Sequence, residues 1–201
     1  MHRRLATTAV ALAGALTLAA CGSDDAASSD TTAAVVEAPT GTAGPVTLNA
    51  ADIEFAQGMI AHHQQAVEMA EIALDPNVGA GPEVIDLATR IQAAQEPEIE
   101  QMTAWLTAAG ESVTMDMSEG HDMSAMEGMM SAEDMDALAA STGAEFDQMW
   151  LEMMILHHEG AISQSETVKA NGSNPDVLAL ADQIITAQQA EITEMRALLA
   201  G

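Results

Sequence analysis

The stretch that decides the fold occurs twice in the chain. Residues 52–66 read DIEFAQGMIAHHQQA, and residues 147–161 read DQMWLEMMILHHEGA, so an acid, an aromatic, Met-Ile and His-His recur at an offset of 95. A second block follows each copy, because the Val, Leu, Ile, Gln, Glu, Ile and Met of 84–102 recur in 177–195 at an offset of 93. An internal repeat of this length indicates one supersecondary unit present twice. The sequence therefore predicts a duplicated helical hairpin.

Four long segments have helical spacing of apolar residues and helix end signals. Asn49 and Asp52 form a candidate capping box, Gly81-Pro82 and Asn174-Pro175 introduce the second and fourth helices, and Asn171-Gly172 ends the third. These signals place helices at about 50–74, 82–110, 144–170 and 175–201. Residues 131–140 predict a short extra helix capped by Ser131 with Asp134, and Pro97 is expected to kink the second helix.

Two hairpins, each with an apolar stripe, bury those stripes against each other most simply in an all-α four-helix bundle. We expect the bundle to span 48–201, with the first hairpin at 48–110, a Met-rich linker at 111–130 and the second hairpin at 131–201.

The N-terminus is predicted to be an export signal. Arg3 and Arg4 precede an apolar run from Leu5 to Ala20 that is too short for a good membrane span. The run ends Leu18-Ala19-Ala20-Cys21, which resembles the bacterial lipobox and implies removal of residues 1–20 and lipidation of Cys21; a chance or buried cysteine is the alternative. Residues 21–47 are rich in Ser, Thr, Ala and Asp and are expected to form a flexible tether. The predicted location is the outer face of the cell membrane, held there by the lipid.

The composition favours cations as partners. The chain has 31 acidic and 5 basic residues and a formal charge of −26, which argues strongly against nucleic-acid binding. A single Cys excludes an intramolecular disulfide framework and a Cys-rich zinc site, whereas Met is abundant, at 15 residues.

The repeated helices place the same polar residues on faces directed into the bundle. The candidate metal ligands there are Met59, His62, His63, Met154, His157 and His158. Candidate supporting polar residues on the same stripes are Asp52, Gln95, Glu98, Asp147, Gln188 and Glu191. Thioethers with imidazoles form a ligand set that suits copper, particularly Cu(I). The alternative is a polar layer satisfied by hydrogen bonds, with Met as filler.

The linker between the hairpins concentrates methionine, with seven Met among the 21 residues 115–135 and no helical stripe to organise them. Its spacings resemble Met-rich copper motifs of bacterial export and resistance proteins. The candidate ligands are Met115, Met117, His121, Met123, Met126, Met129 and Met130. The alternative is a flexible loop whose Met residues fold over the bundle as a lid.

With these motifs, the chain resembles the bacterial domain of unknown function 305 family over roughly residues 48–200. The matching stretches are Met59–His63, Gly128–Ser131, Gly143–Asp147, Met154–Ala161 and Gln188–Met195. The resemblance implies a ferritin-like four-helix bundle, often exported, with copper binding proposed for some members. Pro97 departs from the repeat, where Ala190 stands, and affects the geometry expected around Glu98.

Three functions are compatible with the sequence. The leading hypothesis is a cell-surface protein without enzymatic activity that binds a copper ion, sequestering it or passing it on. A metal-free helical interaction module is the second. A di-metal oxidase of the ferritin-like type is the third and is disfavoured, because such bundles use Glu-x-x-His pairs and this chain has Gln-x-x-Glu.

Overall fold

A computed structural model describes residues 46–115 and 126–201. The predicted signal peptide, Cys21, all but the last two residues of the tether, and the candidate ligands Met117, His121 and Met123 lie outside the described residues. None of the helices in the described part of the chain combines the length and apolar character needed to cross a membrane.

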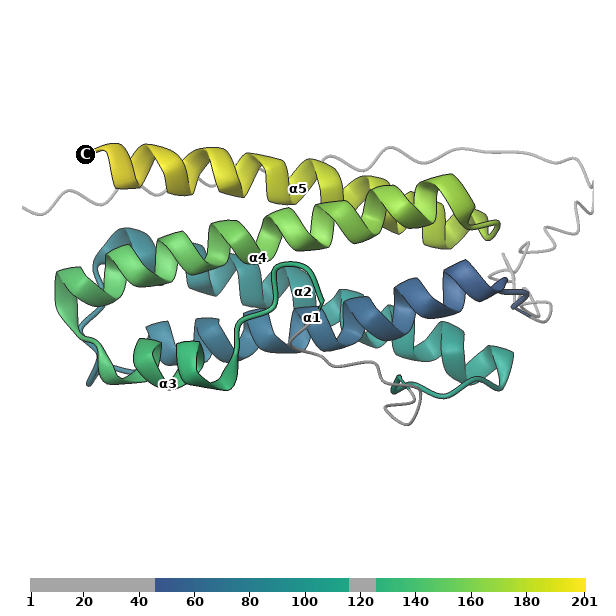
Figure 1. The fold of residues 1–201 in the computed structure, drawn as a ribbon, viewed down its shortest axis with the longest axis horizontal. Helices are drawn as coiled ribbons and strands as arrows, with labels where there is room; N and C mark the ends of the chain where they lie inside the picture. The colour runs from purple at the N-terminus through teal and green to yellow at the C-terminus, as the bar shows by residue number, and fades with distance from the viewer. Residues whose placement is uncertain (1–45, 116–125) are drawn as a thin grey trace, which may run out of the picture. The chain divides into compact units, whose positions relative to one another are not determined.

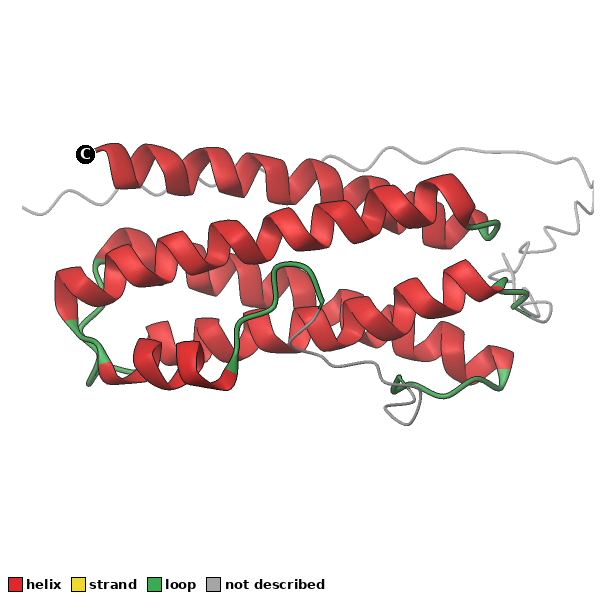
Figure 2. Ribbon diagram, in the orientation of Figure 1, coloured by secondary structure: helices red, strands yellow, loops and turns green. Residues whose placement is uncertain are grey.

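Five helices make up the described chain, which confirms the all-α prediction (Figures 1 and 2). They are α1 (Ala50–Leu74), α2 (Pro82–Ala109), α3 (Ala132–Ala140), α4 (Gly143–Asn171) and α5 (Pro175–Ala200). The capping boxes predicted from Asn49 with Asp52 and from Ser131 with Asp134 are both present. Helix α2 continues through Pro97, which lies on its exposed side, where water can bond the carbonyl that proline leaves free.

The four long helices form the predicted bundle of two hairpins. Helix α1 packs along α2, α4 packs along α5, and the two hairpins meet chiefly where α1 lies against α4 (Figure 1). The short helix α3 joins the hairpins and packs on α4.

Each hairpin holds the turn of the other through one aspartate. Asp52, near the start of α1, accepts hydrogen bonds from the backbone N–H groups of Ser173 (3.0 Å) and Asn174 (3.2 Å) in the α4–α5 turn. Asp147, near the start of α4, accepts one from the N–H of Gly81 (2.9 Å) in the α1–α2 turn. These two candidate polar residues therefore lie at the ends of the bundle, where they join the hairpins.

The apolar core is divided into two clusters. One contains Met69, Leu87, Trp150, Met154 and Met195, and the other contains Phe55, Met59, Met102, Leu106 and Ile184. Every long helix contributes one of its halves to each cluster, and buried polar residues separate the two halves. These polar residues are His62 and His63 in α1, Gln95 in α2, His157 and His158 in α4, and Gln188 in α5. A polar layer thus crosses the middle of the bundle.

Candidate metal centre

Four histidines from the two central helices form the middle of this polar layer. We call His62, His63, His157 and His158 the histidine layer; all four side chains are fully buried. The Met-x-x-His-His repeat brings them together because α1 and α4 are antiparallel neighbours and each places its two histidines at its midpoint. The two His-His pairs, each of which the sequence directs into the bundle, therefore meet in one layer at its middle.

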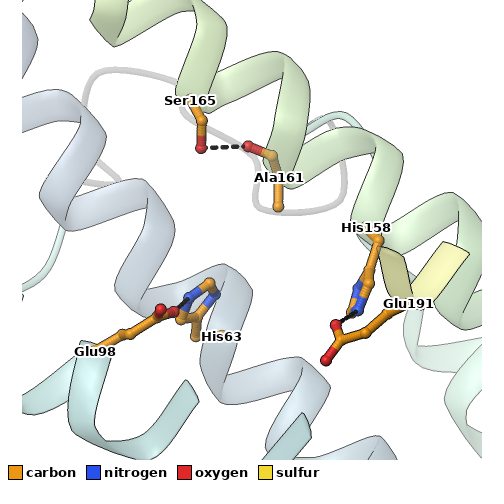
Figure 3. Close-up of polar contacts among 6 residues, drawn as sticks. All are labelled: His63, Glu98, His158, Ala161, Ser165 and Glu191. Carbon is orange, nitrogen blue, oxygen red and sulfur yellow. Dashed lines mark hydrogen bonds and ion pairs between the residues drawn. The ribbon is translucent and has the colours of Figure 1, made fainter. Parts of the chain in front are cut away.

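Two of the four histidines bond a carboxylate from the partner helix of their own hairpin (Figure 3). His63 Nε2 lies 2.6 Å from Glu98 Oε2, and His158 Nε2 lies 2.8 Å from Glu191 Oε2. Because a carboxylate accepts, Nε2 carries the hydrogen, and in the tautomer with hydrogen on Nε2 alone the lone pair lies on Nδ1. No described residue hydrogen-bonds Nδ1 of either ring.

The other two histidines contact each other across the boundary between the hairpins. The ring centroids of His62 and His157 are 3.8 Å apart, with the ring planes inclined at 46°. His62 Nε2 lies 3.4 Å from the backbone carbonyl oxygen of Glu127, a long contact in which the ring is the donor. Within the described chain, His62 Nδ1 and both ring nitrogens of His157 are without a hydrogen-bond partner.

Burial keeps this inner pair neutral. Loss of solvation, assisted by charge repulsion from the nearby His63, lowers the pKa of His62 to about 3. Desolvation likewise lowers the pKa of His157 well below its ordinary value, assisted by repulsion from His62 and His158. Both rings are therefore neutral at neutral pH, which is the form that binds metals.

Gln95 and Gln188 add two further unsatisfied acceptors to the layer. Both side chains are buried, and the described residues supply no donor to the Oε1 atom of either. An unpaired buried polar group costs about 1–3 kcal/mol, so proteins seldom accumulate several in one place. A cluster of buried nitrogen and oxygen atoms that no described residue bonds is therefore the feature that points to a ligand.

The two methionines of the repeat flank the histidine layer on opposite sides. Met59 lies in the apolar cluster with Phe55, and Met154 lies in the cluster with Trp150. Both are fully buried, each one helical turn from its His-His pair. Ser165, the other buried polar residue of α4 in Figure 3, bonds the Ala161 carbonyl of its own helix (2.8 Å).

Two of the described methionines of the linker lie against α1 at Gly58. The methyl carbons of Met115 and Met126 both approach Gly58, each 3.3 Å from the position that a Cβ there would occupy. Met129 and Met130 are half-buried. Met115 and Met126, which precede and follow residues 116–125, therefore come together one turn before His62.

No set of three or more His, Cys, Asp or Glu side chains is arranged around a possible metal position in the described residues. A site among the described residues therefore uses fewer than three of these side chains together with ligands of another kind, such as thioethers, or it uses imidazoles that shift when the ion binds.

The sequence prediction missed the groups that cover the layer on the linker side. The Glu127 carbonyl, Gln65 and Gly160 all take part there. A backbone carbonyl has no signature in the sequence. Gly160 does have one, because a glycine in the interior of a helix is unfavourable unless close packing requires it.

Comparisons with known proteins agree with this architecture. The family model described as Domain of unknown function (DUF305) matches residues 52–199. A DUF305 protein from Streptomyces coelicolor, described as secreted, is 30% identical with a TM-score of 0.67, covering 75% of this chain and 91% of its own. A DUF305 fragment from Deinococcus radiodurans is 30% identical with the same TM-score, covering 78% and 99%.

A third similar structure contains copper. CopM in its Cu(II)-bound form is 35% identical with a TM-score of 0.61, covering 73% of this chain and 94% of its own. Comparison with curated proteins found no match. The matched family model spans most of the chain, and the protein therefore belongs to the DUF305 family.

Proposed function

We propose that this protein is an exported copper-binding protein that holds Cu(I) at the histidine layer and sequesters the ion or passes it on. The observation that carries the proposal is the group of buried imidazole nitrogens in the middle of the core to which no described residue hydrogen-bonds. The similarity to CopM, which has been solved with Cu(II), Cu(I) and Ag, supports the choice of metal.

The hydrogen bonds of the layer suit metal-binding histidines. A ligating histidine usually donates its other ring N–H to a carboxylate or a backbone carbonyl, which fixes its tautomer and orientation. Glu98 does this for His63, Glu191 for His158 and the Glu127 carbonyl for His62. With the hydrogen on Nε2, a ring that carries no second proton would offer the Nδ1 lone pair to a ligand.

The thioethers would complete the set and favour Cu(I). Met59 and Met154 precede the histidines by one helical turn, and a thioether needs no deprotonation before it binds a soft ion. Met115 and Met126, together with the other linker residues Met117, His121, Met123, Met129 and Met130, would capture the ion at the surface.

The surface charge would draw cations toward the protein. All three Lys and Arg side chains of the described residues bind carboxylates: Arg90 pairs with Asp86 and Glu194, Lys169 with Asp182, and Arg196 with Glu159. The remaining acidic side chains leave a strong negative potential, which raises the local concentration of cations.

We further propose that the lipid on Cys21 anchors the exported chain to the membrane. The signal-like N-terminus supports export, and so does the family member from Streptomyces coelicolor that is described as secreted. Mass spectrometry of the purified native protein would detect a diacylglyceryl group on Cys21, and Cys21→Ala should release the protein into the medium.

The test of the metal site is Cu(I) competition against a chromogenic chelator, using residues 22–201 without the lipid. We expect the double variant His62→Leu/His157→Leu to lose the Cu(I) equivalent that the wild type binds most tightly. Ser165→Ala, which alters a buried polar group bonded within its own helix, should retain that equivalent. Glu98→Ala should weaken the affinity about 10–100-fold, as expected for loss of a group that orients a ligand.

The alternative is a metal-free polar layer that fixes the register of the helices. The two His–Glu hydrogen bonds favour it, while the unpaired nitrogens of His62 and His157 do not. It predicts that the double variant changes the free energy of unfolding and leaves Cu(I) binding at the wild-type level.

A further inference from the structure

The stretch that follows residues 116–125 lies directly over the inner histidine pair. We call Met126–Met130 the strap. Figure 1 shows this stretch as an arch that begins beside α1, reaches α4 and descends to α3. Its Glu127 carbonyl oxygen lies 3.4 Å from His62 Nε2, so the strap touches the histidine layer itself.

Two glycines let the strap backbone lie against the backbone of α4. A Cβ on Gly160 would sit 2.0 Å from the Glu127 carbonyl oxygen, a distance that no side chain could tolerate. Gly128 has φ +83°, and a Cβ there would lie 2.7 Å from the Leu156 carbonyl oxygen and 3.0 Å from that of His157. The strap therefore covers the turn of α4 that carries His157.

A glutamine on α1 holds the other side of the strap. The Met130 N–H donates to Gln65 Oε1 (2.7 Å), and Gln65 Nε2 donates to the Met130 carbonyl (2.9 Å). Gln65 and Gly160 occupy equivalent positions of the repeat, at the offset of 95. The same position of the repeat thus contacts the strap on both central helices. On α1 a glutamine side chain bonds it, and on α4 a glycine lets its backbone approach the helix.

The strap can move away from the histidine layer without the unfolding of a helix. It contains no helical residues, and its side chains are half-buried or exposed. Its side-chain hydrogen bonds to the rest of the described chain are the Gln65 pair, the long His62 contact and a bond from Ser163 Oγ to Glu127 Oε2 (2.7 Å). The four histidines beneath are fully buried, so an ion reaches them only if a covering element moves.

We propose that the strap is the gate of the histidine layer and that it opens when Gln65 releases Met130 and the Glu127 carbonyl leaves His62. This inference rests on the proposed function for the identity of the ion. The gate itself concerns access to His62 and His157 and can be measured without metal.

The test compares two glutamines on the same helix. Gln65→Ala removes both hydrogen bonds to the strap, whereas Gln57→Ala removes one bond to the Ser112 carbonyl in the loop after α2 and serves as the control. In metal-free residues 22–201, we expect diethyl pyrocarbonate to modify His62 and His157 about tenfold faster in Gln65→Ala, since one to two lost hydrogen bonds correspond to roughly that factor. Gln57→Ala should react at the wild-type rate.

The same variants are then mixed with Cu(I) supplied as a weak chelate in a stopped-flow experiment. We expect Gln65→Ala to take up the ion about tenfold faster with unchanged stoichiometry. If Gln65→Ala matches wild type in both the modification rate and the uptake rate, the strap is not the gate.

Two outcomes separate this inference from the proposed function. If Gln65→Ala is modified faster but the wild type binds no Cu(I), the strap is the gate of the histidine layer and the proposed copper site is wrong. If Gln65→Ala unfolds, Gly160→Ala provides the second variant, because it displaces the strap from α4 and leaves Gln65 in place; wild-type modification rates in that variant overturn the gate.

Discussion

The outer and inner histidine pairs differ in how closely they follow the duplication. His63 with Glu98 and His158 with Glu191 repeat the same contact in the two hairpins, at 2.6 and 2.8 Å. His62 and His157 are also equivalent in sequence, yet the Glu127 carbonyl bonds only His62, and no described residue bonds either ring nitrogen of His157.

The difference shows what a duplicated hairpin can and cannot make symmetric. Contacts within a hairpin depend on residues that are both copied, so they occur twice. The strap belongs to the linker between the hairpins and exists in one copy, so its contacts distinguish two equivalent histidines. Three predictions test this comparison, ordered from the largest expected effect.

Acid should destabilise the protein chiefly through the inner pair. Both histidines have lowered pKa values in the folded state, about 3 for His62 against an ordinary 6.5, so the unfolded chain binds more protons below pH 6.5. Stability is therefore fully present above pH 6.5 and decreases as the pH falls toward the folded pKa, by about 1.4 kcal/mol per pH unit for each histidine. Between pH 7 and 5 the loss should be about 2 kcal/mol from His62, and His157 adds to it in the same direction.

Urea unfolding at pH 7 and 5 measures this loss, and His62→Leu/His157→Leu provides the control. The double variant keeps the acidic side chains, whose own titration is thereby subtracted. An equal loss in the variant and in wild type would show that other groups govern the acid sensitivity.

Removing the carboxylate that bonds the outer histidine should lower the free energy of unfolding by the same amount in each hairpin. Glu98→Ala or Glu191→Ala leaves a buried His Nε2–H without its acceptor, so we expect about 1–3 kcal/mol of lost unfolding free energy. Glu96→Ala makes the same charge change at an exposed position and should have little effect. Costs that differ by more than about 1 kcal/mol would indicate that Pro97, beside Glu98, breaks the equivalence.

Replacing the least satisfied histidine should stabilise the protein. His157→Leu removes a buried ring with two unpaired nitrogens and replaces it by an apolar side chain, so we expect a gain of about 1 kcal/mol. His62→Leu should gain less, because it also loses the contact with Glu127. Thermal unfolding of the metal-free variants compares their stabilities. A larger gain in stability for His62→Leu than for His157→Leu would contradict the asymmetry of the inner pair.

The sequence was sufficient for the helices and their pairing. The repeat at offsets of 95 and 93 and the end signals at Asn49, Pro82 and Pro175 predicted the bundle and the starts of these helices. The placement of the histidines in the interior followed as well, because helical periodicity determines which residues share a face. Local signals decide these features, so a single sequence can reveal them.

The tertiary structure decided which atoms meet. Heptad spacing placed Asp52 and Asp147 on the same stripes as the histidines, but only the packed bundle shows that they bind the opposite turns at its ends. Likewise, the contact of the strap with His62 depends on a backbone carbonyl and on two glycines from separate segments. The sequence alone therefore predicted that the histidines face the interior, whereas long-range packing determines which polar residues share their layer and which ring nitrogens the described residues bond.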